Sequence, residues 1–248
     1  MKKTCIFANQ KGGVGKTACS LNIGFELAKR GFNILLVDTD PQGNLTSWSG
    51  FDPDSFKTTM FDVMKEKLSM EDIIIDVREH LWIAPSNILL ASIEREIFAS
   101  IGYERLLKKV LQPILDRFDH IIIDSPPSLG APTVNGLVAS DEVYITVACE
   151  HLSVIGTSKL LETIDAVRDN YNPSLEIGKV IPTMYTNTVL AMEMLKQLTD
   201  FFGDKLAKTP IRRNVRIGES AAMGKSIIYY DPASIGARDF ENLVEEII

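Results

Sequence analysis

The chain has 248 residues, of which 45% are hydrophobic, and its formal net charge is −7. This length and composition predict a single α/β domain over residues 1–248 and argue against a linker-rich or repetitive chain. The acidic balance excludes a surface that binds nucleic acid over most of its area. Its three cysteines lie far apart and no apolar run approaches the roughly 20 residues of a membrane span, so we expect a cytoplasmic protein without disulfides.

Apolar runs alternate with helical patterns along almost the whole chain. The predicted strands, in chain order, are residues 4–8, 34–37, 81–84, 121–123, 143–148 and 179–185. The predicted helices, in chain order, are residues 16–30, 103–117 with a break at Pro113, 156–170, 191–202 and 235–248. Strands without polar alternation, separated by helices, indicate a mostly parallel twisted sheet with helices on both faces. Ligands of such sheets bind at the carboxyl ends of the strands.

The segment between the first strand and the first helix has the composition of a phosphate-binding loop. Gly15, Lys16 and Thr17 fill the last three places of the P-loop pattern G-x-x-x-x-G-K-[ST]. Gln10 stands at the first place, and Lys11 adds a second cation. Glycines allow backbone N–H groups to surround phosphate oxygens, and the following helix presents its positive end. We expect Lys16 to reach the β- and γ-phosphates of a nucleotide and the Thr17 hydroxyl to hold Mg²⁺.

Carboxylates follow two of the predicted strands. Asp38 and Asp40 come directly after the second strand, in the stretch Asp-Thr-Asp-Pro-Gln-Gly-Asn, and can point the same way because side chains alternate. Two carboxylates beside a phosphate loop suit water activation and metal organisation. Asp124 ends the strand at residues 121–123, as in a Walker B motif, where the carboxylate assists Mg²⁺.

Residues 205–225 carry a local excess of positive charge. Six cationic side chains stand against one carboxylate, Glu219, so the segment has a charge of six minus one, or +5, and the rest of the chain −12. A basic patch on an acidic protein is a candidate contact for phosphate. The six cations are Lys205, Lys208, Arg212, Arg213, Arg216 and Lys225.

With these motifs the chain resembles the ParA/Soj group of deviant Walker A ATPases, the family that positions chromosomes, plasmids and some other cargoes. The matching stretches are Asn9–Thr17, Val37–Asn44, Ile123–Ser128, Pro182–Tyr185 and Arg213–Arg216. The resemblance implies a P-loop NTPase fold and an ATP-dependent homodimer that binds DNA without sequence preference. It also implies slow hydrolysis, stimulated by a ParB-like centromere-binding protein or another adaptor, and a nucleoid-associated location.

The resemblance also implies roles for individual residues. Lys11 would reach the ATP phosphates of the partner subunit, Lys16 would be the ordinary P-loop lysine, and Asp40 would polarise the attacking water. The implied Mg²⁺ site consists of Thr17, Asp40 and Asp124. The other implied nucleotide contacts are Gly12, Gly13, Val14, Gly15, Ala18, Met184, Arg212 and Asn214. The implied DNA contacts are Arg213, Arg216 and Lys225.

Three positions depart from the family pattern. Arg212 stands where the family often has proline, and Ala18 replaces a frequent second threonine. DNA-binding relatives often carry an arginine shortly after the Thr-Met-Tyr stretch, where this chain has residues 186–188, Thr-Asn-Thr. The DNA inference therefore depends on the segment at 205–225.

Several other functions remain as alternatives. A MinD-like membrane-cycling ATPase should end in a basic amphipathic helix, whereas residues 238–248 have an acidic polar face, which we expect to belong to a helix packed on the core. An iron–sulfur reductase of the nitrogenase type needs two cysteines per subunit at the dimer seam, and Cys149 alone lies near a suitable strand end. A ligase of the dethiobiotin synthetase type fits the paired lysines poorly. Within the positioning family, the cargo could also be a carboxysome or a chemotaxis cluster.

Overall fold

The computed structural model describes residues 2–97, 101–149 and 157–247. Within these ranges the strands form one sheet in the order β3-β4-β2-β5-β1-β6-β7, with every neighbouring pair parallel except β3 and β4. The strands are β1 Lys3–Ala8, β2 Ile34–Asp38, β3 Ile75–Arg78, β4 Leu81–Ala84, β5 His120–Asp124, β6 Glu142–Ala148 and β7 Glu176–Thr183. The predicted fold class, a mostly parallel sheet covered by helices, is confirmed.

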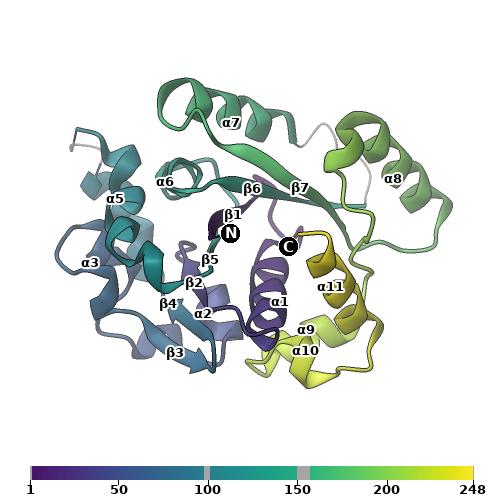
Figure 1. Ribbon diagram of the computed structural model, residues 1–248, viewed down its shortest axis with the longest axis horizontal. Coiled ribbons are helices and arrows are strands. Elements are labelled where there is room, and N and C mark those ends of the chain that lie inside the picture. Colours follow the sequence, from purple (N-terminus) through teal and green to yellow (C-terminus); the bar gives the residue numbers. More distant parts are fainter. Residues whose placement is uncertain (1, 98–100, 150–156, 248) are drawn as a thin grey trace.

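Helices lie on both faces of the sheet, as Figure 1 shows. The long ones are α1 Lys16–Lys29, α7 Ser158–Asn170, α8 Val189–Phe202 and α11 Ile235–Glu245. The shorter ones are α2 Asn44–Trp48, α3 Met60–Met64, α4 Ile93–Ile97, α5 Leu106–Leu111, α6 Ala131–Ala139, α9 Val215–Ala222 and α10 Ile227–Tyr230.

The sheet separates two hydrophobic clusters because successive side chains of a strand point to opposite faces. Along β1, Ile6 and Ala8 belong to one cluster, while Cys5 and Phe7 belong to the other. The second cluster contains the apolar faces of α1 and α11, which lie side by side in Figure 1. Phe240 and other apolar residues of α11 are fully buried there, so the last helix packs on the core as predicted.

The predicted elements agree with the structure except at a few boundaries. The predicted helix at 103–117 is divided: 3-10 turns at Tyr103–Arg105 and Gln112–Arg117 flank α5, and the second turn contains Pro113, which cannot donate a helical hydrogen bond. Residue 156, the predicted start of α7, lies outside the described residues, as does residue 248. The predicted elements do not include β3, a four-residue edge strand that joins β4 through His80 at φ 61°. They also leave out six of the shorter helices: α2, α3, α4, α6, α9 and α10.

No helix in the described part of the chain is both long enough and apolar enough to cross a membrane. The three cysteines are buried as free thiols, and burial raises the pKa of each, that of Cys149 to about 11. Thiols of this kind are inert small core residues.

Candidate functional site

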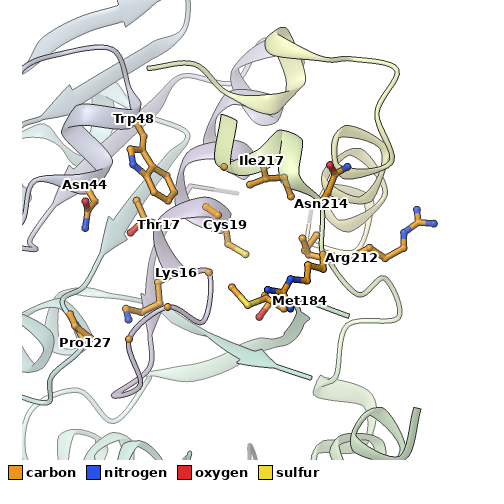
Figure 2. A pocket seen from close by; sticks show the side chains of 18 of the residues that line it. Lys16, Thr17, Cys19, Asn44, Trp48, Pro127, Met184, Arg212, Asn214 and Ile217 are labelled. Carbon is orange, nitrogen blue, oxygen red and sulfur yellow. The ribbon is translucent and has the colours of Figure 1, made fainter. Parts of the chain in front are cut away.

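A cavity of about 660 Å³ lies at the carboxyl ends of β1, β2 and β7, a volume within the range of small-molecule sites. The phosphate loop and the first turn of α1 form its floor, and α2 and α9 contribute its walls (Figure 2). Its lining includes Gly12, Gly13, Gly15, Lys16, Thr17, Ala18, Cys19, Asp40, Asn44, Trp48, Pro127, Thr183, Met184, Ile211, Arg212, Arg213, Asn214, Val215, Ile217 and Gly218. The cavity therefore brings together residues from near the two ends of the chain, such as Gly12 and Gly218.

The phosphate loop is held in place from three sides. Gly15 caps α1 with φ 85°, a left-handed conformation that favours glycine, and an added Cβ would lie 3.4 Å from the Thr183 side chain. Thr183 donates a hydrogen bond to the carbonyl of Val14 at 2.9 Å. Asn9, which is buried, donates to the backbone of β6 and accepts from the N–H of Lys11. The loop is thus preorganised, and Val14, whose side chain is buried, does not line the cavity.

Lys16 lies inside the cavity and is 6% exposed. Its ammonium donates to the carbonyl of Lys11 at 3.3 Å, and an ammonium has three N–H donors, so capacity remains for a phosphate oxygen. Burial lowers the pKa of Lys16, while the nearby charges of Asp124 and Asp40 act in the opposite direction. A partly desolvated cation at a helix N-terminus is an anion site.

Lys11 occupies a different position. It is exposed at the tip of the loop, and it is not among the described residues that line the cavity. The two lysines of the motif thus differ in their surroundings: Lys16 is buried in the cavity of its own chain, whereas Lys11 is exposed and does not line that cavity.

Asp124 is fully buried beneath the first turn of α1. Its two carboxylate oxygens accept hydrogen bonds from the hydroxyls of Thr17, at 2.7 Å, and Ser20, at 3.0 Å. Burial raises its pKa to about 6, an effect that these hydrogen bonds and the charge of Lys16 partly offset. A buried carboxylate that orients a threonine hydroxyl, with Asp40 nearby in the cavity wall, is a set of hard oxygen donors, which fits Mg²⁺ bound mainly through phosphates and water.

The structure separates the roles of Asp38 and Asp40. Asp40 lines the cavity. The side chain of Asp38 instead points away from the cavity and accepts hydrogen bonds from the backbone and hydroxyl of Thr46, at 2.9 and 2.7 Å. Burial and the nearby Asp124 raise the pKa of Asp38 to about 8. The expectation that both carboxylates act on water or metal is therefore corrected: Asp38 braces the start of α2.

The other end of the cavity combines apolar and polar side chains. Met184, Ile211 and Arg212 line it together with Asn214. Backbone hydrogen bonds from Tyr185 to the carbonyl of Ile211 and from Arg213 to the carbonyl of Tyr185 join the two segments into one wall. Asn214 caps α9 by accepting from the N–H of Arg216 at 2.9 Å, which fixes its side chain beside the cavity. These predicted nucleotide contacts are brought together with the phosphate loop.

Ion pairs reduce the positive charge of the segment at 205–225. Arg212 is held by the buried Asp239 of α11 through both Nε, at 3.0 Å, and Nη2, at 2.5 Å. Arg216 pairs with Glu219 at 2.7 Å and with Asp231 at 3.5 Å. The other four cations of the segment are exposed, and the described residues place no carboxylate within ion-pair distance of them: Lys205, Lys208, Arg213 and Lys225. The +5 count therefore overstates the charge that the segment offers to a ligand.

The site residues predicted from the sequence do not include several residues of the cavity wall, among them Trp48 and Ile217. Trp48 ends α2, four residues after the Asp-x-Asp-Pro-Gln-Gly-Asn stretch, and Ile217 lies in the first turn of α9. The one available signal was that Trp48 is one of only two tryptophans in the sequence and follows the motif closely.

Comparisons with known proteins agree with this geometry. The family model "AAA domain" matches residues 2–177. The chain is 42% identical to the chromosome-partitioning ATPase Soj of Treponema pallidum, with 100% of this chain and 98% of the relative covered. It is also 42% identical to the sporulation initiation inhibitor protein Soj of Bacillus subtilis, with the same coverage.

Among solved structures, cobyrinic acid a,c-diamide synthase of Mycobacterium smegmatis with bound ATP analogue and magnesium superposes with a TM-score of 0.89. It is 32% identical, and the alignment covers 99% of this chain and 93% of that one. The full-length identity to the Soj proteins and the motifs gathered around the cavity show that the chain belongs to the ParA/Soj family of deviant Walker A ATPases.

Proposed function

We propose that the protein is a partition or positioning ATPase that binds ATP and Mg²⁺ in the cavity, dimerises around the nucleotide and hydrolyses it slowly. The single observation that carries this proposal is the separation of the two motif lysines. Lys16 is buried in the cavity, whereas Lys11 is exposed outside it. An exposed cation next to the phosphate loop can neutralise the phosphates of a second copy placed face to face.

Hydrolysis requires a water molecule to attack the γ-phosphorus. The bond between the γ-phosphorus and the oxygen that bridges it to the β-phosphate breaks, and ADP leaves with that oxygen. The proton of the water passes to the released phosphate. Mg²⁺ held by Thr17 and supported by Asp124 would neutralise charge on the β- and γ-phosphates. Among the described residues that line the cavity, Asp40 is the one carboxylate. With Asp40 alone to position the water, the intrinsic rate of ATP hydrolysis would be slow, and a partner protein could raise it.

The nucleotide-bound dimer is proposed to bind DNA through its exposed cations. Arg213 lies beside Asn214 and so connects the nucleotide cavity to the protein surface. Two copies placed side by side would double the unpaired cations, and contacts with phosphates carry no base specificity. Release would follow hydrolysis stimulated by a ParB-like or other adaptor protein. The cargo would then be chromosomal or plasmid DNA, or another body carried over the nucleoid.

The name of the solved mycobacterial structure, a diamide synthase, describes a different reaction class. Identity to it is 32%, compared with 42% to the two Soj proteins. The higher identity to the Soj proteins favours the partition function over a diamide synthase activity. ATP-dependent dimerisation tests the partition function directly, because it needs no small-molecule acceptor.

The test compares Lys11→Ala with Lys16→Ala by size-exclusion chromatography with light scattering, in Mg²⁺ and a non-hydrolysable ATP analogue. Wild type should become a dimer. Lys11→Ala should bind the analogue in calorimetry and stay a monomer, because the contact across the dimer is missing. Lys16→Ala should lose nucleotide binding by at least about a hundredfold, since it removes a charge-assisted contact in a desolvated site. A Lys11→Ala protein that dimerises as well as wild type would contradict the proposal.

A further inference from the structure

Trp48 forms part of the nucleotide cavity, and neither the phosphate chemistry nor the Mg²⁺ site makes use of it. The residue is half-buried at the end of α2, the short helix that begins directly after the turn carrying Asp40. In Figure 2 its indole ring lies beside Thr17 and faces the space above Cys19, with Ile217 across from it. A large flat apolar surface is therefore exposed to whatever occupies the cavity.

The helix that carries this ring is held in place by its surroundings. Gly43 caps α2 with φ 62°, and a Cβ there would lie 3.0 Å from Pro53 and from the carbonyl of Ser86. Asp38 holds the next turn through the N–H and hydroxyl of Thr46. The helix also packs on α1 and α9. A helix held in this way needs little ordering of its backbone when a ligand reaches Trp48, which favours binding.

The chemistry of the indole matches a nucleoside and not a phosphate. Aromatic rings bind bases by stacking, and that surface has no attraction for a triphosphate chain. Among the described residues the Nε1–H of Trp48 has no hydrogen-bond acceptor, so this donor is available to a ribose hydroxyl. Ile217 and Cys19 supply apolar surface to the same part of the cavity.

We infer that Trp48 is a nucleoside-contacting residue, which covers the ribose and base of a bound purine nucleoside triphosphate and couples occupancy of the cavity to α2. The inference rests on the proposed nucleotide binding and specifies which part of the ligand Trp48 recognises. Because α2 follows the Asp40 turn directly, contact with the nucleoside would also steady the residue that positions water. Nucleotides should accordingly be favoured over inorganic tripolyphosphate.

The first test uses the intrinsic fluorescence of Trp48. Trp82, the other tryptophan, lies on β4 against Phe118, with ring centroids 5.6 Å apart, and does not line the cavity. In a Trp82→Phe background, emission should therefore come from Trp48. Titration with ATP and Mg²⁺ should change this emission in a saturable way, whereas tripolyphosphate and Mg²⁺ should leave it unchanged. Equal changes with both ligands would overturn the inference, because the ring would then report on movement of the phosphate loop.

The second test separates contact from structure. Trp48→Ala should weaken ATP binding about tenfold in calorimetry, the low end of the effect of losing a base–aromatic stack, while tripolyphosphate affinity stays within about twofold. Trp48→Phe, which keeps an aromatic face, should bind ATP within about threefold of wild type. Equal losses for ATP and tripolyphosphate, or no loss of ATP affinity, would overturn the inference. If wild type itself bound tripolyphosphate but not ATP, the proposed function would fail before the role of Trp48 is tested.

Discussion

The phosphate loop and the basic segment at 205–225 are the two parts of the molecule that carry the proposed function, and they differ in how their charges are held. In the loop, Lys16 is buried, Thr183 donates a hydrogen bond to the carbonyl of Val14, and the N–H of Lys11 donates one to the Asn9 side chain. In the segment, the cations are exposed and two of the six, Arg212 and Arg216, pair with carboxylates.

The difference shows which kind of charge a sequence can reveal. The glycines, lysine and threonine of the loop are close neighbours in the sequence. Their spacing alone therefore predicts the conformation of the loop. The pairing of Arg212 depends on Asp239, 27 residues away on α11. A count of charges over residues 205–225 leaves out a carboxylate such as Asp239, which lies outside the segment. Variants of the paired and unpaired cations should therefore behave differently.

The largest effect is expected at Asp40. Asp40→Ala removes the carboxylate that positions water, so steady-state ATP hydrolysis should fall by about a hundredfold or more. ATP affinity, measured by calorimetry, should stay within a few-fold, because the phosphate contacts come from Lys16 and the loop. The variant should accumulate as the ATP-bound dimer. Turnover at the wild-type rate would show that the cavity contains another residue that positions water.

A smaller effect is expected on DNA binding, and it should distinguish Arg213 from Arg212. Arg213→Ala should weaken binding of the ATP-analogue dimer to random-sequence duplex by about tenfold, equally for all sequences, and should flatten its salt dependence. Arg212→Ala should change DNA affinity much less, because Asp239 already occupies its guanidinium. Gel retardation at low salt with both variants makes the comparison.

Arg212→Ala should instead affect stability. It leaves the Asp239 carboxylate, whose side chain is 3% exposed, without its cation, and we expect a loss of about 1–2 kcal/mol in chemical denaturation. If Arg212→Ala weakened DNA binding as much as Arg213→Ala without loss of stability, the ion pair would not hold Arg212 away from DNA.

The corrected charge also changes the expected salt dependence. With Arg212 and Arg216 paired, each chain offers about four of its six cations, and its contact with DNA should lose about two orders of magnitude in affinity between about 50 and about 200 mM salt. The six cations counted from the sequence would give about three orders. Titrations at several salt concentrations separate the two values.

The smallest effect concerns the pH dependence of stability and tests the role of Asp38. The pKa of its carboxyl is raised from 3.8 to about 8, so the folded protein binds more protons than the unfolded chain between these values, and stability falls as pH rises through that range. Asp38→Asn removes this titration. The free energy of unfolding of wild type should therefore fall between about pH 5 and about pH 8 by at least about 1 kcal/mol more than that of Asp38→Asn. This difference corresponds to roughly one pKa unit. Parallel stability curves for the two proteins would show that Asp38 does not titrate in the fold.

Much of the fold and of the phosphate site was predictable because the signals are local. Buried strands such as β1 and β2 are short apolar runs, and α1 follows a loop whose residues specify its start. The edge strand β3 was not predicted because it has no continuous apolar run. Its side chains alternate between half-buried and exposed, and it pairs antiparallel with β4. The separate roles of Asp38 and Asp40 depend on the hydrogen bonds from Thr46, so strand alternation alone does not predict them. The position of Trp48 depends on the packing of α2 against α9, which are far apart in the sequence.

The central claim is that ATP in the cavity controls the basic surface by joining two copies of the chain. The most direct measurement compares the affinity of wild-type protein for random-sequence duplex DNA with a non-hydrolysable ATP analogue and with ADP, at low salt and equal Mg²⁺. Doubling the number of phosphate contacts should make the ATP-analogue form bind at least about tenfold more tightly. Equal affinity in the two nucleotide states, with both nucleotides bound, would contradict the account.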